Sequence, residues 1–433
     1  MDPNEIRSEE ITDEDLDRAA EAYKTFLTEA DGAQRAEVEG MLQRVAEEYE
    51  RFDEFVESID KPGAAVQDPA ALDRAMVELL SEDAEDTPEI AYLWNMARGR
   101  PVTRRPMREP TVTPRGGILG SGRYQLQDIR WLAAGTQWLL NIHRKAPFEK
   151  NFRVVDMPDT ASVALLGDWG TGYFSEACPA SKVCQAVKAQ DPDYTIHLGD
   201  VYYSGDAGEV ETNFLPHWPG GRLGTFALNS NHEMYVRGRG IFEHLLKDPR
   251  FEAQGGATVF ALENSHWVIV GLDSARFANK FNLYRTGRLD DSQQEFLRER
   301  VEQAGGRGII VLTHHNGLEL RAQRCDPLWS QVRDALGGRE ARWYWGHLHS
   351  AIVYRDIDGI RGRCCGHGAM PRGRASIMDG VGEVNWFEQS LANDPDIPPR
   401  VVNGFAMLRL DGAELQEVFI DENGHETLPP GTG

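Results

Sequence analysis

Residues 162–170, SVALLGDWG, residues 194–203, YTIHLGDVYY, and residues 225–233, TFALNSNHE, share one pattern. Each is a short apolar run that stops at a turn carrying an Asp or Asn side chain. These side chains are Asp168, Asp200 and Asn231. Residues 308–315, GIIVLTHH, and residues 342–349, RWYWGHLH, repeat the pattern with histidines at the turn. The five runs predict strands, each of which delivers polar side chains at its end.

The spacing of these turns indicates how they are arranged in space. Asp168 and Asp200 are 32 residues apart, Asp200 and Asn231 are 31 apart, and His314 and His347 are 33 apart. Each gap fits one strand-helix-strand unit, so successive turns return to the same edge of a sheet. Functional side chains of α/β sheets gather at that edge. We therefore expect the five turns to form one site.

Helices and hairpins complete the predicted fold. Amphipathic segments at 181–189 and 292–303 predict helices between strands, and a helix is expected at 126–142. Paired apolar runs at 258–272, 351–364 and 404–420 predict β-hairpins. We expect an α/β protein built as a four-layer α/β/β/α sandwich of two mixed sheets, preceded by an acidic helical module.

Three segments are expected along the 433-residue chain: an acidic helical module at 1–97, a Pro/Arg-rich linker at 98–125, and the main domain at 126–433, whose motif-bearing part is about 160–420. Residues 1–60 contain 20 Asp or Glu and 6 Lys or Arg, and their apolar residues fall on helical stripes. This module is either a docking surface for a protein partner or a solvated acidic face. The linker is either solvated or an extended segment lying on the main domain.

Charge and cysteine content limit the function classes. The formal net charge is -23, and because much of it lies in residues 1–60, a nucleic-acid partner is disfavoured for the N-terminal part. The five cysteines lack the spacing of a zinc ribbon and, being odd in number, do not indicate a disulfide framework. No apolar run is long enough to cross a membrane, and the first residues do not resemble a secretion signal. We expect a cytoplasmic protein with reduced thiols and no membrane partner.

The side chains at the five turns are typical metal ligands. Carboxylates, an amide, a phenol and imidazoles on separate strand ends are the ingredients of a site for two metal ions. A single Gly-Asp turn or a single His would mean little, because both are common in ordinary turns and cores. The combination of five turns favours a metal centre.

These motifs resemble the calcineurin-like metallophosphoesterases, and their variant residues resemble the purple acid phosphatase branch. The first motif reads Asp168-Trp169-Gly170 rather than Asp-x-His, and Tyr203 stands three residues after Asp200. The resemblance implies two metal ions, Fe together with Fe, Zn or Mn. Asp168, Asp200, Tyr203 and His349 would hold the first, and Asp200, Asn231, His314 and His347 would hold the second. Ser230 and Asn316 depart from the usual family residues without removing a ligand.

The resemblance also implies a function, metal-dependent hydrolysis of a phosphoester by a metal-activated hydroxide that attacks phosphorus in line. His232 would be the catalytic residue, as it would stabilise charge or protonate the leaving oxygen. Glu233 and His315 are expected near the substrate or behind the ligands, with Glu233 orienting His232. The alternative is a catalytically weak metal-bound phosphoryl sensor or regulatory interaction protein. Residues that are either pocket-lining or packed are Trp169, Tyr173, Tyr235, Arg237 and His367.

Overall fold

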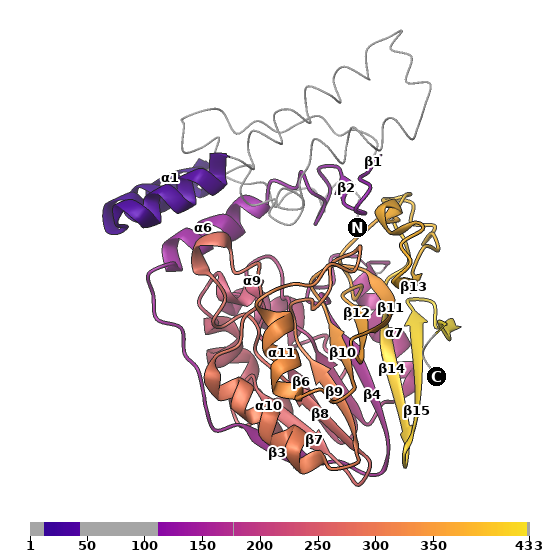
Figure 1. The fold of residues 1–433 in the computed structure, drawn as a ribbon. Helices are drawn as coiled ribbons and strands as arrows, with labels where there is room; N and C mark the ends of the chain where they lie inside the picture. The colour runs from indigo at the N-terminus through magenta and orange to yellow at the C-terminus, as the bar shows by residue number, and fades with distance from the viewer. Residues whose placement is uncertain (1–12, 44–110, 176, 431–433) are drawn as a thin grey trace.

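Two mixed sheets form the centre of the computed structural model, which describes residues 13–43, 111–175 and 177–430 (Figure 1). The larger sheet has the order β13 (Val384–Phe387), β11 (Ala351–Ile357), β12 (Ile360–Cys365), β10 (Ala341–Trp345), β9 (Gly308–Leu312), β8 (Trp267–Gly271), β7 (Phe260–Glu263) and β3 (Arg153–Asp156). The smaller has the order β16 (Glu426–Thr427), β15 (Glu414–Asp421), β14 (Gly404–Asp411), β4 (Thr160–Leu166), β5 (Tyr194–His197) and β6 (Gly224–Ala227).

Alternation of side chains along the strands separates the layers. In β4, Val163 and Leu165 face the core between the sheets, whereas Ala164 and Leu166 face the layer that contains α7 (Pro179–Gln190). In β9, Ile310 and Leu312 face the central core, and their neighbours face α10 (Asp291–Ala304) and α11 (Leu328–Leu336). This is the period of two that strands impose. The predicted four-layer α/β/β/α sandwich is confirmed.

Strand directions bring the motif turns together, as the spacing predicted. Strands β4, β5 and β6 are parallel, as are β8, β9, β10 and β12, while β7/β8, β11/β12 and β14/β15 are antiparallel pairs. Main-chain bonds then join turns of the two sheets, since the amide of Gly167 donates to the carbonyl of Cys365 at 3.0 Å. The short helices α8 (Ala207–Glu209) and α9 (Asn231–Met234) follow two of these turns.

The described part of the N-terminal module consists of helices packed on α6 (Trp131–Asn141), as Figure 1 shows. Helix α1 (Asp13–Glu29) and the helical residues 32–43 bury Phe26 and Leu42 in the same apolar cluster as Trp138 of α6. The Asp31 carboxylate begins the second helix by accepting from the amides of Ala33 and Gln34, each at 2.9 Å. The predicted elements at 45–97 lie outside the described residues.

Residues 111–125, expected to be part of a linker, are packed on the main domain. They form a small hairpin from β1 (Thr111–Val112) and β2 (Ile118–Leu119). The Tyr124 hydroxyl donates to the carbonyl of Thr171 at 2.7 Å, and Thr113 is buried. The described part of this segment therefore lies on the main domain, which is the second of the two alternatives, and is not a solvated linker. Helix α6 begins at Trp131 rather than near residue 126, because 126–130 are turns held by Asp128.

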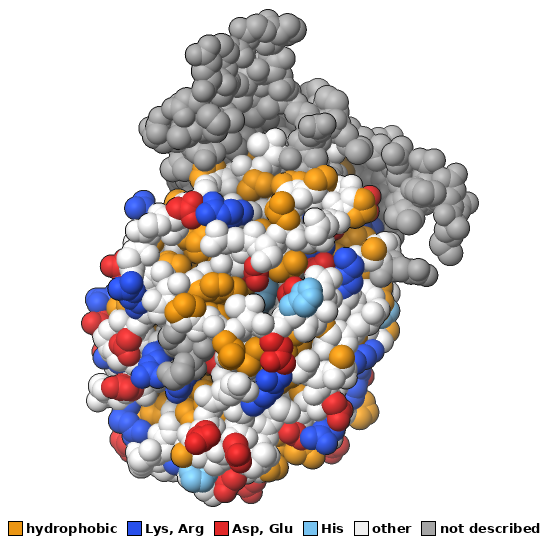
Figure 2. All heavy atoms as spheres, turned by 90° about the vertical axis from the view of Figure 1, so that its right-hand side faces the viewer, with side chains coloured by type: hydrophobic (Ala, Val, Ile, Leu, Met, Phe, Trp, Pro, Cys, Tyr) orange, Lys and Arg blue, Asp and Glu red, His pale blue; other side chains and the backbone are white. Residues whose placement is uncertain are grey.

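The surface carries mixed charge on the face seen in Figure 2, where Lys or Arg and Asp or Glu side chains are interspersed. No field of a single sign covers that face. Within the described ranges, no helix is both long and apolar enough to cross a bilayer.

Candidate metal centre

The candidate ligands lie at strand ends in a backbone conformation that non-glycine residues seldom adopt. Asp168, Asp200, His347 and His349 have φ values of 58°, 75°, 68° and 50°. Left-handed backbone at side chains with a Cβ costs free energy, and such strain gathers at functional sites. The turns are crowded as well, because a Cβ on Gly346 would meet the Asp168 Oδ2 atom at 2.6 Å. The sequence thus places strained turns where the two sheets meet.

Asp168, Asp200 and His349 form the first cluster. Each offers one ligand atom, and these atoms lie within 4.8 Å of one another. The His349 Nε2 atom lies 3.2 Å from Asp168 Oδ1. The Tyr202 hydroxyl lies 2.8 Å from Asp200 Oδ2, 2.9 Å from His349 Nε2 and 3.2 Å from Asp168 Oδ1. A phenol therefore joins two carboxylates and an imidazole, as expected for the first metal, but it comes from Tyr202.

Tyr203, the expected phenol ligand, points elsewhere. Its hydroxyl donates to Asp128 Oδ2 at 2.6 Å, and its ring stacks on Tyr124 with centroids 4.6 Å apart. Burial, followed by Asp128, raises the pKa of Tyr203 well above the usual value, which keeps the hydroxyl protonated. In the structure the phenol beside the carboxylates is thus Tyr202, one residue before the expected Tyr203. The reason is that the buried Asp128 acceptor draws the second phenol of the Tyr202-Tyr203 pair away from the carboxylates.

The donor set of this cluster fits a cation. The Tyr202 hydroxyl has one proton and faces two carboxylate oxygens, on Asp168 and Asp200, and it also lies beside the Nε2 atom of His349. Burial and the neighbouring Asp200 raise the pKa of Asp168 well above its usual range. The cluster without a cation therefore has to retain an additional proton between the carboxylates, and a cation replaces that proton.

A second group of acceptors lies on the other side of Asp200. The His314 Nδ1 atom lies 2.9 Å from the carbonyl of Leu198, so this nitrogen carries the ring proton, because a carbonyl only accepts. Burial lowers the pKa of His314 to about 4, so the ring is neutral and Nε2 presents a lone pair. That atom faces Asn231 Oδ1 at 2.8 Å and Asp200 Oδ1 at 3.4 Å. Three acceptors that face one another also fit a cation.

His347 lies beside this second group. Its ring centroid is 5.1 Å from that of His314, and its amide donates to Asp168 Oδ2 at 2.9 Å. Burial, then His314, lowers the pKa of His347 to about 3, so the ring is neutral. Of the four residues expected at the second metal, the structure thus brings together the ligand atoms of Asp200, Asn231 and His314 and places the His347 ring next to that of His314.

Asp200 is shared by the two groups, as predicted for a bridging residue. Its Oδ2 atom faces Tyr202 and its Oδ1 atom faces His314. Burial alone would raise the pKa of Asp200, but His232, His314 and a hydrogen bond from Ser230 outweigh burial and hold that pKa well below its usual range. Asp200 is therefore the ionised member of the carboxylate pair, which suits a bridging ligand.

His232 lies beside the first group without joining it. Its Nδ1 atom lies 2.7 Å from the carbonyl of Tyr203, and its Nε2 atom lies 3.8 Å from Asp200 Oδ2. The ring contacts the rings of Tyr202 and Tyr235, with centroids 4.6 and 4.8 Å away. The His232 imidazole therefore lies at the margin of the carboxylates.

Glu233 and His315 lie behind the ligands. Glu233 accepts from the amide of Val201 at 2.8 Å and from the Ser230 hydroxyl, so it supports the Asp200 turn. From the sequence we expected Glu233 to orient His232, but its hydrogen bonds go to Val201 and Ser230 instead. The His315 ring lies 2.9 Å from Ser274 Oγ and 2.7 Å from the carbonyl of Tyr284. Both of its ring nitrogens are engaged by these partners, so His315 is a supporting residue that packs against His347.

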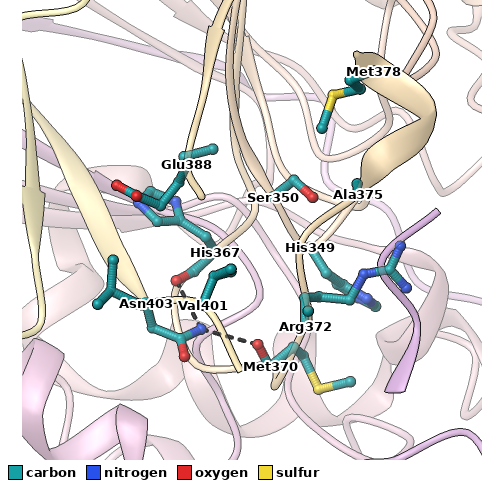
Figure 3. Close-up of a pocket in the computed structure, with 13 residues that line it drawn as sticks. His349, Ser350, His367, Met370, Arg372, Ala375, Met378, Glu388, Val401 and Asn403 are labelled. Carbon is teal, nitrogen blue, oxygen red and sulfur yellow. Dashed lines mark hydrogen bonds between the residues drawn. The ribbon is translucent and has the colours of Figure 1, made fainter. Parts of the chain in front are cut away.

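A small cavity of about 10 Å³ borders His349, which is room for about one water molecule. Figure 3 shows Arg372 and His349 on one side of this cavity and His367 on the other. Two dashed bonds run from the Asn403 amide to the carbonyls of His367 and Met370, at 3.0 and 2.9 Å. His367 therefore lines a cavity next to a candidate ligand.

The other residues considered for the pocket have structural contacts. Trp169 is buried and donates to the carbonyl of Ala180 at 3.1 Å. Tyr173 stacks on His217 at 3.8 Å, and Arg237 binds the Arg144 carbonyl and the Tyr284 hydroxyl. Sequence reasoning missed Tyr202, for which the adjacent tyrosine was the only signal, and Asp128, for which the sequence carries no motif.

The fold and the site define a class: an α/β sandwich of two sheets whose facing strand ends gather carboxylates, imidazoles, an amide and a phenol suited to cations. Residues 161–368 match the calcineurin-like phosphoesterase family. This region of the chain is therefore recognised as a calcineurin-like phosphoesterase region. The match supports metal-dependent phosphoester hydrolysis.

Comparison with solved structures gives distant neighbours. GAP50, the anchor in the inner membrane complex of Plasmodium, has 14% identity and a TM-score of 0.44, with 62% of this chain and 87% of that chain covered. A dimetal phosphatase from Danio rerio has 12% identity and a TM-score of 0.39, with 60% and 95% covered. At these scores the likeness carries no argument. Comparison with curated proteins found no match to the sequence.

Proposed function

We propose that the protein hydrolyses phosphate esters at a dinuclear metal centre formed by Asp168, Asp200, Tyr202, Asn231, His314, His347 and His349. The observation that carries the proposal is the excess of acceptors over protons around Asp200. Two cations at such a donor set would polarise the phosphate oxygens and lower the pKa of a water, so that hydroxide is available near neutral pH.

The residues of the chain divide the remaining work. Asp200 holds the two ligand groups together, and Glu233 and Ser230 fix its turn. His232 directs Nε2 toward Asp200, since its Nδ1 faces the Tyr203 carbonyl. In that orientation a His232 ring that carries a second proton, on Nε2, can donate it to a leaving oxygen as charge develops there, which leaves the neutral ring with its proton on Nδ1. Asp168, Asp200, Asn231 and His314 are buried, whereas His347 and His349 are partly exposed.

The donor types suggest which cations bind. Phenol and carboxylate oxygens around Asp168 and Tyr202 suit a trivalent iron, and the imidazoles around Asn231 suit Zn, Mn or Fe in the divalent state. The proposal includes membership of the purple acid phosphatase branch, with Tyr202 in place of Tyr203 as the phenolate ligand. A cytoplasmic location and a protein partner for the acidic N-terminal helices stay predictions.

Metal analysis followed by turnover of p-nitrophenyl phosphate tests the proposal. We expect about two metal equivalents per chain, and turnover that chelator removes and added metal restores. The phosphoryl sensor is the alternative: it would bind inorganic phosphate in the metal-loaded state without turning over aryl or alkyl phosphates. Metal-loaded protein that neither hydrolyses nor binds a phosphate compound would contradict both.

A further inference from the structure

The Asp128 carboxylate, just before α6, lies against the site although no motif contains it. It is 1% exposed. Its Oδ2 atom accepts from the Tyr203 hydroxyl at 2.6 Å and from the amide of Tyr124 at 2.7 Å. Its Oδ1 atom accepts from the amide and Nε of Arg130, at 3.1 and 2.7 Å. Asp128 is therefore a fully engaged acceptor that holds Tyr203.

Tyr203 is fixed at both ends. Its hydroxyl binds Asp128, and its ring lies between Tyr124 and Trp131, with centroids 4.6 and 4.8 Å away. At the other end its main-chain carbonyl lies 2.7 Å from His232 Nδ1. The amide of Tyr203 is held separately by Glu209. Tyr203 thus connects a buried carboxylate outside the motifs to the imidazole at the site.

The Tyr203 carbonyl determines the orientation of His232. Because a carbonyl oxygen only accepts, His232 Nδ1 carries the proton of this bond. The other nitrogen, Nε2, then lies on the side of Asp200, 3.8 Å from its Oδ2 atom. A change in the position of the carbonyl would turn Nε2 away from the carboxylates.

We infer that Asp128 is a positioning residue for His232: it holds the Tyr203 hydroxyl, and Tyr203 in turn holds the imidazole through its main-chain carbonyl. The inference rests on the proposed function. It assigns a role in the reaction to the segment 111–130, which supplies no metal ligand. Without Asp128 the Tyr203 hydroxyl is left buried without this acceptor, and the tyrosine has to shift to find another.

The kinetic test compares Asp128→Ala with a matched control. Asp193 is a suitable control, because it too joins a main-chain amide, a hydroxyl and an arginine, here of Ser162 and Arg222, and it precedes β5 at the end opposite Asp200. General acid help is worth ~10²–10⁴ in rate with a poor leaving group. We expect Asp128→Ala to lower kcat for an alkyl phosphate by about 10- to 100-fold and for p-nitrophenyl phosphate by about threefold or less.

Further variants separate positioning from instability. Metal content and KM should stay unchanged in Asp128→Ala, and Asp193→Ala at equal loss of thermal stability should show no substrate-dependent effect. When Asp128→Ala is added to His232→Ala, kcat should fall little further, because the two residues act on the same step. Asp128→Asn and Tyr203→Phe, which keep side-chain volume, provide the same comparison if Asp128→Ala does not fold. Equal losses on both substrates, or additive losses with His232→Ala, would overturn the inference.

A second measurement does not depend on catalysis. In metal-free protein labelled with ¹⁵N-histidine, the His232 signal, identified by its absence in His232→Ala, should report a proton fixed on Nδ1. Asp128→Ala should shift this signal or average the two tautomers, whereas Asp193→Ala should not. An unchanged His232 signal in Asp128→Ala contradicts positioning even where turnover falls. If wild type turns over no phosphate ester, the proposed function fails, and this spectrum alone decides whether Asp128 positions His232.

Discussion

Buried polar atoms differ in their hydrogen bonding between two regions of the molecule. These regions are the strand ends around Asp200 and the segment 111–141 that packs against them. Around Asp200, the Tyr202 hydroxyl has one proton for two carboxylate oxygens, and His314 Nε2 faces two further acceptors. In the segment, each oxygen of Asp128 faces donors only. A satisfied buried network supports structure, whereas a surplus of acceptors marks a place for cations.

The two adjacent tyrosines show the same contrast in two residues. Tyr202 directs its hydroxyl to the carboxylates, and Tyr203 directs its hydroxyl to Asp128. One phenol belongs to the site and the other supports it. The experiments below test this division, from the largest expected effect to the smallest.

Asp200→Asn should abolish turnover. It removes the charge shared by the two ligand groups, and loss of metal assistance amounts to several kcal/mol of transition-state stabilisation, which is roughly 10³-fold or more in kcat/KM. Metal analysis and p-nitrophenyl phosphate turnover provide the measurement, and Asp193→Asn is the control, with unchanged metal content. Full activity in Asp200→Asn would remove the bridging role on which the proposed centre depends.

His232→Ala should keep both metals and slow an alkyl phosphate by ~10²–10⁴, with a smaller effect on a nitrophenyl phosphate. The reason is that an alkoxide needs a proton as it leaves, whereas nitrophenolate is already a stable anion. The loss should fall in kcat rather than in KM. Equal losses on the two substrates would indicate charge stabilisation instead, and loss of a metal would make His232 a ligand.

Tyr202→Phe should weaken binding of the first metal by about 10- to 100-fold and remove the charge-transfer colour of the iron-loaded protein. Tyr203→Phe removes only the hydroxyl that binds Asp128, so it should keep both the metal and the colour. Absorbance spectra and competition with a chelator measure the difference. Bleaching by Tyr203→Phe and not by Tyr202→Phe would reverse the assignment made from the structure.

Acid should destabilise the metal-free protein. Burial lowers the pKa of His197, His315 and His347 to about 3 and of His314 and His367 to about 4, and it holds the pKa of His349 well below its usual value. Unfolded imidazoles bind protons near pH 6.5, so between there and about pH 4 the unfolded state binds more protons. The free energy of unfolding therefore falls as pH falls through this window. Buried carboxyls with raised pKa values, such as Asp168, Glu209 and Glu233, act in the opposite sense but are fewer.

Urea unfolding of chelator-treated protein at pH 7 and pH 5 measures this effect, and hydrogen exchange locates it. Residues 308–315 and 342–349 should lose more protection at pH 5 than α6, because the segment 111–141 contains no histidine. A free energy of unfolding that is unchanged or larger at pH 5 would contradict the prediction.

Phe26→Ala should have the smallest effect on turnover. Phe26 is buried between α1 and α6 and stacks on His143, so its truncation should cost about 3–5 kcal/mol in the stability of that contact. No described residue of α1 contributes to the ligand groups, so kcat/KM should stay within about twofold, a change of under ~0.5 kcal/mol. A large loss of activity with metals retained would show that α1 reaches the site through α6.

Much of the site was predictable because its residues occur in short sequence patterns that can be recognised locally. Apolar runs that stop at Asp168, Asp200, Asn231, His314 and His347, with gaps of one strand-helix-strand unit, determine that these side chains share one edge. The same runs predict the strands, since alternate residues of β4 and β9 face two different cores. Periodicity and spacing are properties of the sequence itself, so they can be recognised without knowing which residues are in contact in the folded protein.

Only the tertiary structure decided between Tyr202 and Tyr203. Both are buried phenols beside Asp200, and the choice depends on Asp128, which lies 75 residues away in the sequence. The packing of residues 111–125 could likewise not be decided from the sequence, because Pro/Arg-rich composition fits both a solvated linker and an extended segment on the main domain. The outcome depends on the surface that receives the segment, such as the Thr171 carbonyl that accepts from Tyr124. The sequence by itself determined which groups gather at the strand ends; long-range contacts determined which of two neighbouring phenols joins them.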